Sequence, residues 1–203
     1  MRGEPKDRHR FLIGSTNPGK VREYREILGG LDLELVAPTD LNPVPLEPDE
    51  DALTFAENAS AKARGYAAAS GLQTIADDSG LEVYALRGAP GVRSRRFFGD
   101  DASAEERNAK LLALLDGVKD RSARFVCVTA LASPDGHVEL FEGEVHGEIA
   151  EVPRGEAGFG YDPVFVIARD GRTMAELPPA EKHRVSHRGL AGAKLRARLA
   201  GGA

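Results

Sequence analysis

Phe11-Leu12-Ile13-Gly14-Ser15-Thr16-Asn17-Pro18-Gly19-Lys20 is the stretch that decides the fold of this chain. It begins as a short apolar strand, continues through a turn rich in glycine and proline, and enters a helix. Val21, Tyr24 and Leu28 then recur at helical spacing, and Gly29-Gly30 ends the helix. A strand, a glycine turn and a helix in this order predict the first unit of an α/β fold.

The turn also has the chemistry of a phosphate site. Gly14 to Lys20 nearly match the phosphate-binding pattern in which a lysine is followed by a serine or threonine that holds magnesium, but Val21 occupies that last position. A helix N-terminus directs backbone N–H groups and a positive dipole at an anion, and Lys20 adds a full charge. The segment predicts phosphate binding with the metal held elsewhere. Taken alone, it also fits a strand–turn–helix corner with a solvated lysine.

Length and composition bound the class of protein. The 203 residues, 41% hydrophobic and 29% charged, predict a single domain over residues 1–203 with a flexible tail at 1–9. The net charge of −5 argues against a surface that coats nucleic acid. No apolar stretch approaches the roughly 18 residues of a membrane span. The lone Cys127 lies in an apolar run, which predicts that it is a buried strand residue. Because a single cysteine cannot form an intramolecular disulfide, we expect a protein of the reducing cytoplasm.

Strands and helices alternate in the first half of the chain, and hairpins follow. Capping boxes at Thr54/Glu57 and Ser103/Glu106 predict two helix starts, and Pro134-Asp135-Gly136 predicts a hairpin turn. This order predicts an α/β fold with an elongated mixed β-sheet flanked by helices. We expect strands at 11–13, 33–36, 73–76, 81–86, 124–132, 138–145 and 164–168, and helices at 21–28, 54–71, 103–115 and 186–199.

Two adjacent carboxylates, Asp77 and Asp78, follow the apolar residues 73–76 in what we interpret as a turn over residues 77–80. Ligands of α/β sheets gather beyond the carboxyl ends of strands. Because neighbouring residues of an extended segment point in opposite directions, only one carboxylate is expected to face a given site. The alternative is ordinary turn chemistry.

A metal site needs further oxygen ligands. The acidic run Asp49-Glu50-Asp51 precedes a helix, where negative charge is favourable in any case. Magnesium binds one or two carboxylates together with phosphate oxygens and water. Glu50 and Asp78 would supply that pair if the fold brought them together.

Two later segments have the composition of a base pocket. In Gly158-Phe159-Gly160-Tyr161-Asp162-Pro163, glycines flank an aromatic ring that could stack on a flat ligand. Ser186 caps the last helix and places His187 and Arg188 in its first turn, where a cation is unfavourable against the helix dipole. This placement suggests that both side chains face a base edge or a phosphate. The alternatives are a turn pinned by core aromatics and two solvated basic residues.

Together these segments resemble the inosine triphosphate pyrophosphatase family, the XTP/dITP diphosphatases that remove deaminated purine nucleotides. The resemblance covers nearly the whole chain. It rests on the order and spacing of residues 15–20, 53–59, 75–81, 88–92, 159–163 and 186–188.

The resemblance implies a mixed α/β structure of two lobes with a central cleft, a homodimer, and a requirement for Mg²⁺. It implies hydrolysis of ITP, dITP or XTP to the monophosphate and pyrophosphate, with a free nucleoside triphosphate as the only partner and neither nucleic acid nor membrane involved. Asp78 is implied as the general base, and Glu50 and Asp78 as the metal-associated carboxylates. The implied substrate contacts are Ser15, Thr16, Asn17, Pro18, Gly19, Lys20, Lys62, Ser79 and Lys182 for phosphate, and Phe159, Gly160, Tyr161, Asp162, His187 and Arg188 for the base.

Two other functions remain open. One is a nucleotide- or RNA-binding module that does not hydrolyse its ligand, although pure binding has no use for a metal-linked base. The other is a related pyrophosphatase that acts on other modified bases or on pyrimidines. The chemistry favours hydrolysis, because lysines, helix N–H groups and magnesium all stabilise the negative charge that develops on phosphate.

Overall fold

A six-stranded mixed sheet organises the molecule. The computed structural model describes residues 9–201, so most of the tail expected at 1–9 lies outside the described residues, and His9 already belongs to a strand. The sheet order is β2-β1-β3-β4-β5-β6. β1 is parallel to β2 and β3, and the remaining pairs are antiparallel. The strands are β1 His9–Ile13, β2 Leu33–Val36, β3 Gln73–Val83, β4 Ser122–Ala132, β5 Val138–Ile149 and β6 Phe165–Ile167.

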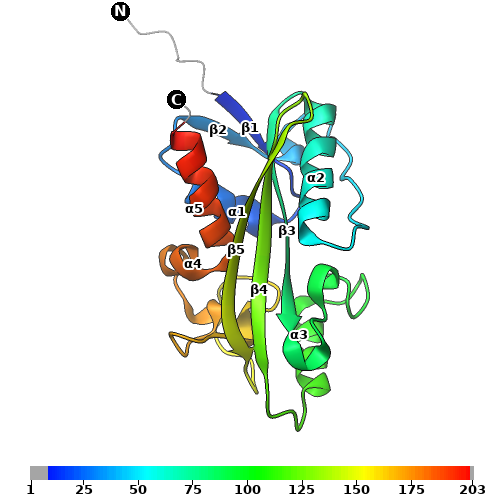
Figure 1. Ribbon diagram of the computed structural model, residues 1–203, viewed down its shortest axis with the longest axis vertical. Helices are drawn as coiled ribbons and strands as arrows, with labels where there is room; N and C mark the ends of the chain where they lie inside the picture. The colour runs from blue at the N-terminus through cyan, green and yellow to red at the C-terminus, as the bar shows by residue number, and fades with distance from the viewer. Residues whose placement is uncertain (1–8, 202–203) are drawn as a thin grey trace, which may run out of the picture.

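Helices lie on both sides of this sheet, whose long β4–β5 hairpin follows the long axis of the molecule (Figure 1). They are α1 Pro18–Ile27, α2 Phe55–Ser70, α3 Ala104–Leu114, α4 Pro179–Val185 and α5 His187–Ala200. Both predicted helix starts are confirmed: the Thr54 side chain accepts from Glu57 N, and the Ser103 side chain accepts from Glu106 N. The reciprocal bond of a capping box is present at Ser103. The predicted α/β class and mixed sheet are confirmed.

β3 corrects one expectation. The turn predicted at 77–80 does not exist, because residues Thr74 to Val83 pair continuously with β4. The second strand expected over 81–86 is the end of β3, which stops at Val83 and is followed by a short 3-10 turn over Tyr84–Leu86. The local Asp-Asp-Ser-Gly sequence favours a turn, but pairing across ten residue positions outweighs that preference.

The two faces of β3 alternate as a strand requires. Ile75 packs with α1 and α5, whereas Ala76 packs with α2. Farther along, Leu81 and Val83 join a third core with α3 and Phe165. The polar side chains of β3 therefore lie between the apolar cores around Ile75 and Ala76 and the core that contains Leu81 and Val83.

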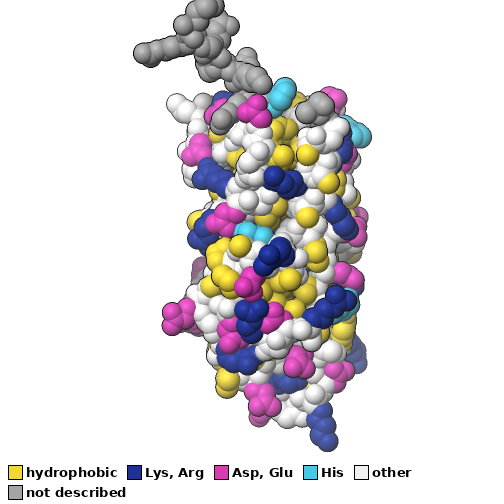
Figure 2. Space-filling model, turned by 90° about the vertical axis from the view of Figure 1, so that its left-hand side faces the viewer, with side chains coloured by type: hydrophobic (Ala, Val, Ile, Leu, Met, Phe, Trp, Pro, Cys, Tyr) yellow, Lys and Arg dark blue, Asp and Glu magenta, His cyan; other side chains and the backbone are white. Residues whose placement is uncertain are grey.

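On the face of the molecule that carries α4 and α5, acidic and basic side chains are interspersed (Figure 2). None of the described helices is long and apolar enough to cross a membrane.

Candidate active site

The loop after β1 is organised by its own side chains. Asn17 caps α1, and its Oδ1 accepts from the backbone N–H of Gly19 at 2.8 Å and of Lys20 at 3.4 Å. Ser15 Oγ accepts from Asn17 N at 3.2 Å, and Pro18 occupies the first turn. The loop thus has a fixed shape before any ligand arrives, which is the preorganisation that anion binding at a helix N-terminus uses.

Lys20 extends from this loop to the middle of β3. Its Nζ lies 3.1 Å from Asp77 Oδ2 and donates to the carbonyl of Asp77 at 3.2 Å. Lys62, from α2, donates to the same carbonyl at 3.5 Å. Burial, reinforced by the charge of Lys20, lowers the pKa of Lys62 to about 8. Two ammonium groups therefore converge on one backbone oxygen beside the loop.

Asp78 faces α2. Its Oδ2 accepts from Asn58 Nδ2 at 2.9 Å, and its Oδ1 accepts from the backbone N–H of Ser79 at 2.9 Å. Burial raises the pKa of Asp78, and this effect outweighs the opposing charge of Lys20. A buried carboxylate with a raised pKa is better suited to accept a proton than an exposed one.

Asp77 faces the opposite side of the sheet. Its Oδ2 accepts from Arg188 Nη2 at 2.9 Å, and Oδ1, although buried, has no hydrogen-bond partner. Burial opposes ionisation of Asp77, but the charges of Arg188, Lys20 and Lys62 outweigh it and hold the pKa well below its usual range. Asp77 is therefore a permanent anion among cations.

The acidic segment before α2 is held against this cluster. Glu50 is ion-paired with Lys62, and its carbonyl accepts from Arg96 Nη2 at 2.6 Å. Asn58, which binds Asp78, also binds the backbone N–H of Ala52 at 2.9 Å. Thr16 of the loop donates to Glu47 at 2.6 Å. The fold thus gathers Glu50 and Asp78 around two side chains of α2, one turn apart.

The second group of predicted residues lies beyond the loop. The Phe159 ring packs over Gly19, so closely that a Cβ there would lie 2.7 Å from the ring. Lys182 Nζ and the Arg188 guanidinium lie 5.0 and 5.4 Å from the centre of the ring. Gly158 and Gly160, both with positive φ, allow the chain to turn sharply on either side of Phe159.

Lys182 lies at this aromatic end. Its Nζ donates to Asp162 Oδ2 at 2.6 Å and to Glu23 Oε1 at 2.7 Å. The same Asp162 oxygen accepts from the backbone N–H of Phe159 at 2.8 Å. The side chain implied as a phosphate contact is therefore a neighbour of the aromatic segment.

Other predicted base contacts point into the protein. Tyr161 is buried and donates to the carbonyl of Ser94 at 2.9 Å, and the carbonyl of Gly160 accepts from Asn108 at 3.1 Å. His187 is buried and stacks on Phe125 with ring centres 4.5 Å apart. Burial, with the charge of Arg188, holds the pKa of His187 well below its usual value, so the ring is neutral.

Arg188 is 2% exposed and is surrounded by hydrogen-bond acceptors. Besides Asp77 it donates to Glu23 Oε2 at 2.7 Å and to Ser79 Oγ at 2.8 Å. The alternative of two solvated basic residues at the start of α5 is therefore wrong. A hydrogen bond therefore connects Ser79, which was predicted to contact phosphate, with Arg188, which was predicted to contact the base.

Two residues of this site were missed from the sequence, Glu23 and Asn58. Glu23 lies among the buried residues of α1, between Val21 and Tyr24. A charge within an apolar stripe was the available signal. Asn58 lies one helical turn before Lys62 on α2, a spacing that places both on one face.

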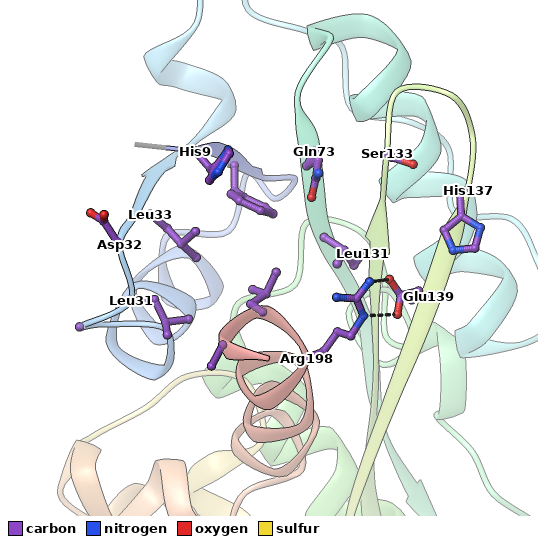
Figure 3. A pocket seen from close by; sticks show the side chains of 14 residues that line it. His9, Leu31, Asp32, Leu33, Gln73, Leu131, Ser133, His137, Glu139 and Arg198 are labelled. Carbon is purple, nitrogen blue, oxygen red and sulfur yellow. Dashed lines mark hydrogen bonds and ion pairs between the residues drawn. The ribbon is translucent and has the colours of Figure 1, made fainter. Parts of the chain in front are cut away.

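A separate cavity of about 850 Å³ lies at the other end of β1, where β1 and β3 begin and α5 ends (Figure 3). Arg198 pairs with Glu139 in its wall at 2.8 and 2.9 Å. Its lining includes none of the predicted site residues.

Comparisons with known proteins agree on one family. The model of the Ham1 family matches residues 11–198. The dITP/XTP pyrophosphatase of Geobacter sulfurreducens is 49% identical over 192 residues, which cover 94% of this chain and 96% of that protein. The dITP/XTP pyrophosphatase of Thermus thermophilus is 50% identical over 184 residues, which cover 90% and 87%.

Solved structures give the same result. The HAM1 protein from Coxiella burnetii superposes with a TM-score of 0.86 at 41% identity, covering 95% of this chain and 99% of that one. The Ham1 protein of Staphylococcus aureus superposes with a TM-score of 0.84 at 41% identity, covering 96% and 100%.

Proposed function

The chain belongs to the Ham1 family, and from this premise we propose that it hydrolyses the non-standard purine triphosphates ITP, dITP and XTP to the monophosphate and pyrophosphate. It is a nucleoside triphosphate pyrophosphatase that clears deaminated purines from the nucleotide pool. One observation carries the chemistry: Asp78, with a raised pKa, lies beside a phosphate loop whose lysine converges with Lys62 on one carbonyl of β3.

The donor set fits a magnesium ion. Glu50 and Asp78 offer carboxylate oxygens, and Glu50 already contacts a cation, the ammonium of Lys62. Among residues 9–201 there is no cluster of three or more acidic, histidine or cysteine side chains for a metal. A two-carboxylate site completed by phosphate oxygens and water is the arrangement that magnesium favours. When bound, Mg²⁺ would neutralise phosphate charge and ease deprotonation of water.

The protein groups divide the reaction between them. Asp78 accepts a proton from water, whose oxygen bonds to the α-phosphorus while the bond from that phosphorus to the bridging oxygen breaks. Pyrophosphate leaves with the bridging oxygen. Lys20, Lys62 and the N-terminus of α1 stabilise the negative charge that develops on the phosphate oxygens. Direct attack by water requires no covalent intermediate. The thiol of Cys127 is buried, and burial raises its pKa to about 12, which makes it a poor nucleophile.

Base selection belongs to the aromatic end. Phe159 offers a ring face to the purine, and the ammonium of Lys182, with three N–H donors, has one left after Glu23 and Asp162. An N–H group aimed at position 6 donates to a keto oxygen but faces another donor in the 6-amino group of adenine. Leaving a buried donor unpaired makes such discrimination large. We assign this contact to Lys182 together with Arg188 and backbone N–H groups, in place of the phosphate role first implied for Lys182.

The enzyme is expected to act as one domain, as a homodimer and in the cytoplasm, on free nucleotides, without nucleic acid or membrane. These expectations stay predictions. Size-exclusion chromatography with light scattering measures the oligomeric state directly. For a homodimer we expect a mass of twice 21.7 kDa.

The decisive experiment measures pyrophosphate release from ITP, dITP, XTP, dATP, dGTP and dTTP, with Mg²⁺ and after chelation by EDTA. We expect turnover of the first three only with Mg²⁺. Equal turnover of dTTP and dITP would overturn the purine assignment. Tight binding of ITP with no pyrophosphate release would favour the non-hydrolysing module instead.

A further inference from the structure

Six basic and acidic side chains alternate through the site, and we call them the charge chain: Lys20, Asp77, Arg188, Glu23, Lys182 and Asp162. Each contacts the next. Along this order the contact distances are 3.1, 2.9, 2.7, 2.7 and 2.6 Å. The chain begins at the phosphate loop and ends at the carboxylate that binds the backbone N–H of Phe159.

The charge chain is shielded from water. The Lys20 side chain is 13% exposed, and the other five are 7% exposed or less. Charges that are poorly solvated interact more strongly and over longer range than surface charges. A change at one end therefore alters the balance of contacts along the whole series.

Glu23 links the two halves of the charge chain. Its Oε1 accepts from Lys182 and its Oε2 from Arg188. Among the described residues it is the only carboxylate that contacts both cations. Without its charge, the series would separate into a phosphate-side group of Lys20, Asp77 and Arg188 and a base-side pair of Lys182 and Asp162.

We propose that Glu23 is a positioning residue that couples phosphate binding to base binding. This inference rests on the proposed function and deepens it. A phosphate that attracts Lys20 weakens its contact with Asp77, so Asp77 holds Arg188 more strongly. Arg188 then holds Glu23 less, Glu23 holds Lys182 more, and Asp162 is freed to accept from the base. The base pocket is thereby prepared when the phosphate loop is filled.

The test uses the two parts of a nucleotide as separate probes. Calorimetry gives the Kd of inosine with and without saturating inorganic tripolyphosphate, both in the presence of Mg²⁺. For the natural protein we expect tripolyphosphate to tighten inosine binding by about tenfold, within the usual range of coupling between sites. In Glu23→Gln this ratio should fall to about one. Glu26→Gln is the matched control, because Glu26 lies three residues after Glu23 on α1 and, among the described residues, its side chain pairs only with His183; its ratio should equal that of the natural protein.

The outcomes separate the inference from the function beneath it. Failure of both probes to bind the natural protein overturns the proposed function. Binding of both with a ratio of one, or an unchanged ratio in folded Glu23→Gln, overturns the coupling alone. If Glu23→Gln does not fold, Glu23→Asp keeps the charge but is too short to hold both cations at once; a reduced ratio supports the inference, and an unchanged ratio overturns it.

Discussion

Asp77 and Asp78 are neighbours on β3, yet Asp77 Oδ2 accepts from Arg188 of α5 and Asp78 Oδ2 from Asn58 of α2, each at 2.9 Å. The strand's alternation thus sends two identical side chains into different surroundings. Burial opposes ionisation of both. Three cations overcome it at Asp77, whereas at Asp78 burial prevails and the pKa is raised. One residue becomes a fixed anion and the other a base.

This division predicts opposite results for two matched substitutions. Asp78→Asn should lower kcat for ITP by about 10²- to 10⁴-fold, the usual contribution of a general base, while nucleotide binding remains measurable. Asp77→Asn leaves buried cations without their counter-charge and should lower the free energy of unfolding by about 3–5 kcal/mol. Steady-state kinetics and urea denaturation measure the two effects. A near-normal kcat in Asp78→Asn would show that another group activates the water.

Phe159 should contribute binding without chemistry. Base–aromatic stacking is worth about 1–3 kcal/mol, so Phe159→Ala should raise KM for ITP by about 5- to 150-fold with kcat little changed. The Kd of inorganic tripolyphosphate serves as the internal control and should not move, because that probe has no base. An equal loss for ITP and tripolyphosphate would mean that the ring supports the Gly19 loop instead.

Asn58 supports both Asp78 and the acidic segment that carries Glu50. Asn58→Leu should lower kcat by roughly 10- to 100-fold, as expected when a group that orients a functional carboxylate is lost. The backbone N–H of Ala52 should also exchange faster with deuterium, since its acceptor is removed. The neighbouring Glu57→Gln affects only the helix cap and should leave kcat unchanged. Slow exchange at Ala52 in the Leu variant would argue that other contacts hold the segment.

Glu23 should make folding sensitive to acid. Burial opposes its ionisation, but Arg188 and Lys182 outweigh burial and lower its pKa from 4.5 to about 2. A carboxylate with a lowered folded-state pKa stabilises the fold above its unfolded pKa, and loses that contribution as the pH falls from about 4.5 to about 2. The contribution is on the order of 3 kcal/mol. Denaturation of the natural protein and Glu23→Gln across this range should show their stability difference shrinking; a constant difference would contradict it.

Local signals predicted local structure well. The capping boxes gave the starts of α2 and α3, because a cap depends on residues within one turn. The turn predicted at 77–80 was wrong because only pairing with β4, some fifty residues later, extends β3 through it.

The site follows the same division. The loop, the carboxylates and the aromatic segment could be proposed from the sequence because each is a contiguous motif, and their roles stay predictions. Glu23 and the base-side position of Lys182 could not be read from spacing, because they depend on how α1, α4 and α5 meet.

The turn of the β4–β5 hairpin divides the charge chain into two halves of the sequence. Lys20, Glu23 and Asp77 precede the turn, and Asp162, Lys182 and Arg188 follow it. A chimera joined at that turn would take three charges from each parent. The chimera would keep the alternating ion pairs of the charge chain only if both parents have side chains of the same charge sign at these six positions. Attempts to exchange base preference between relatives by recombination must therefore transfer Glu23 and Asp77 with the distant segment that reads the base.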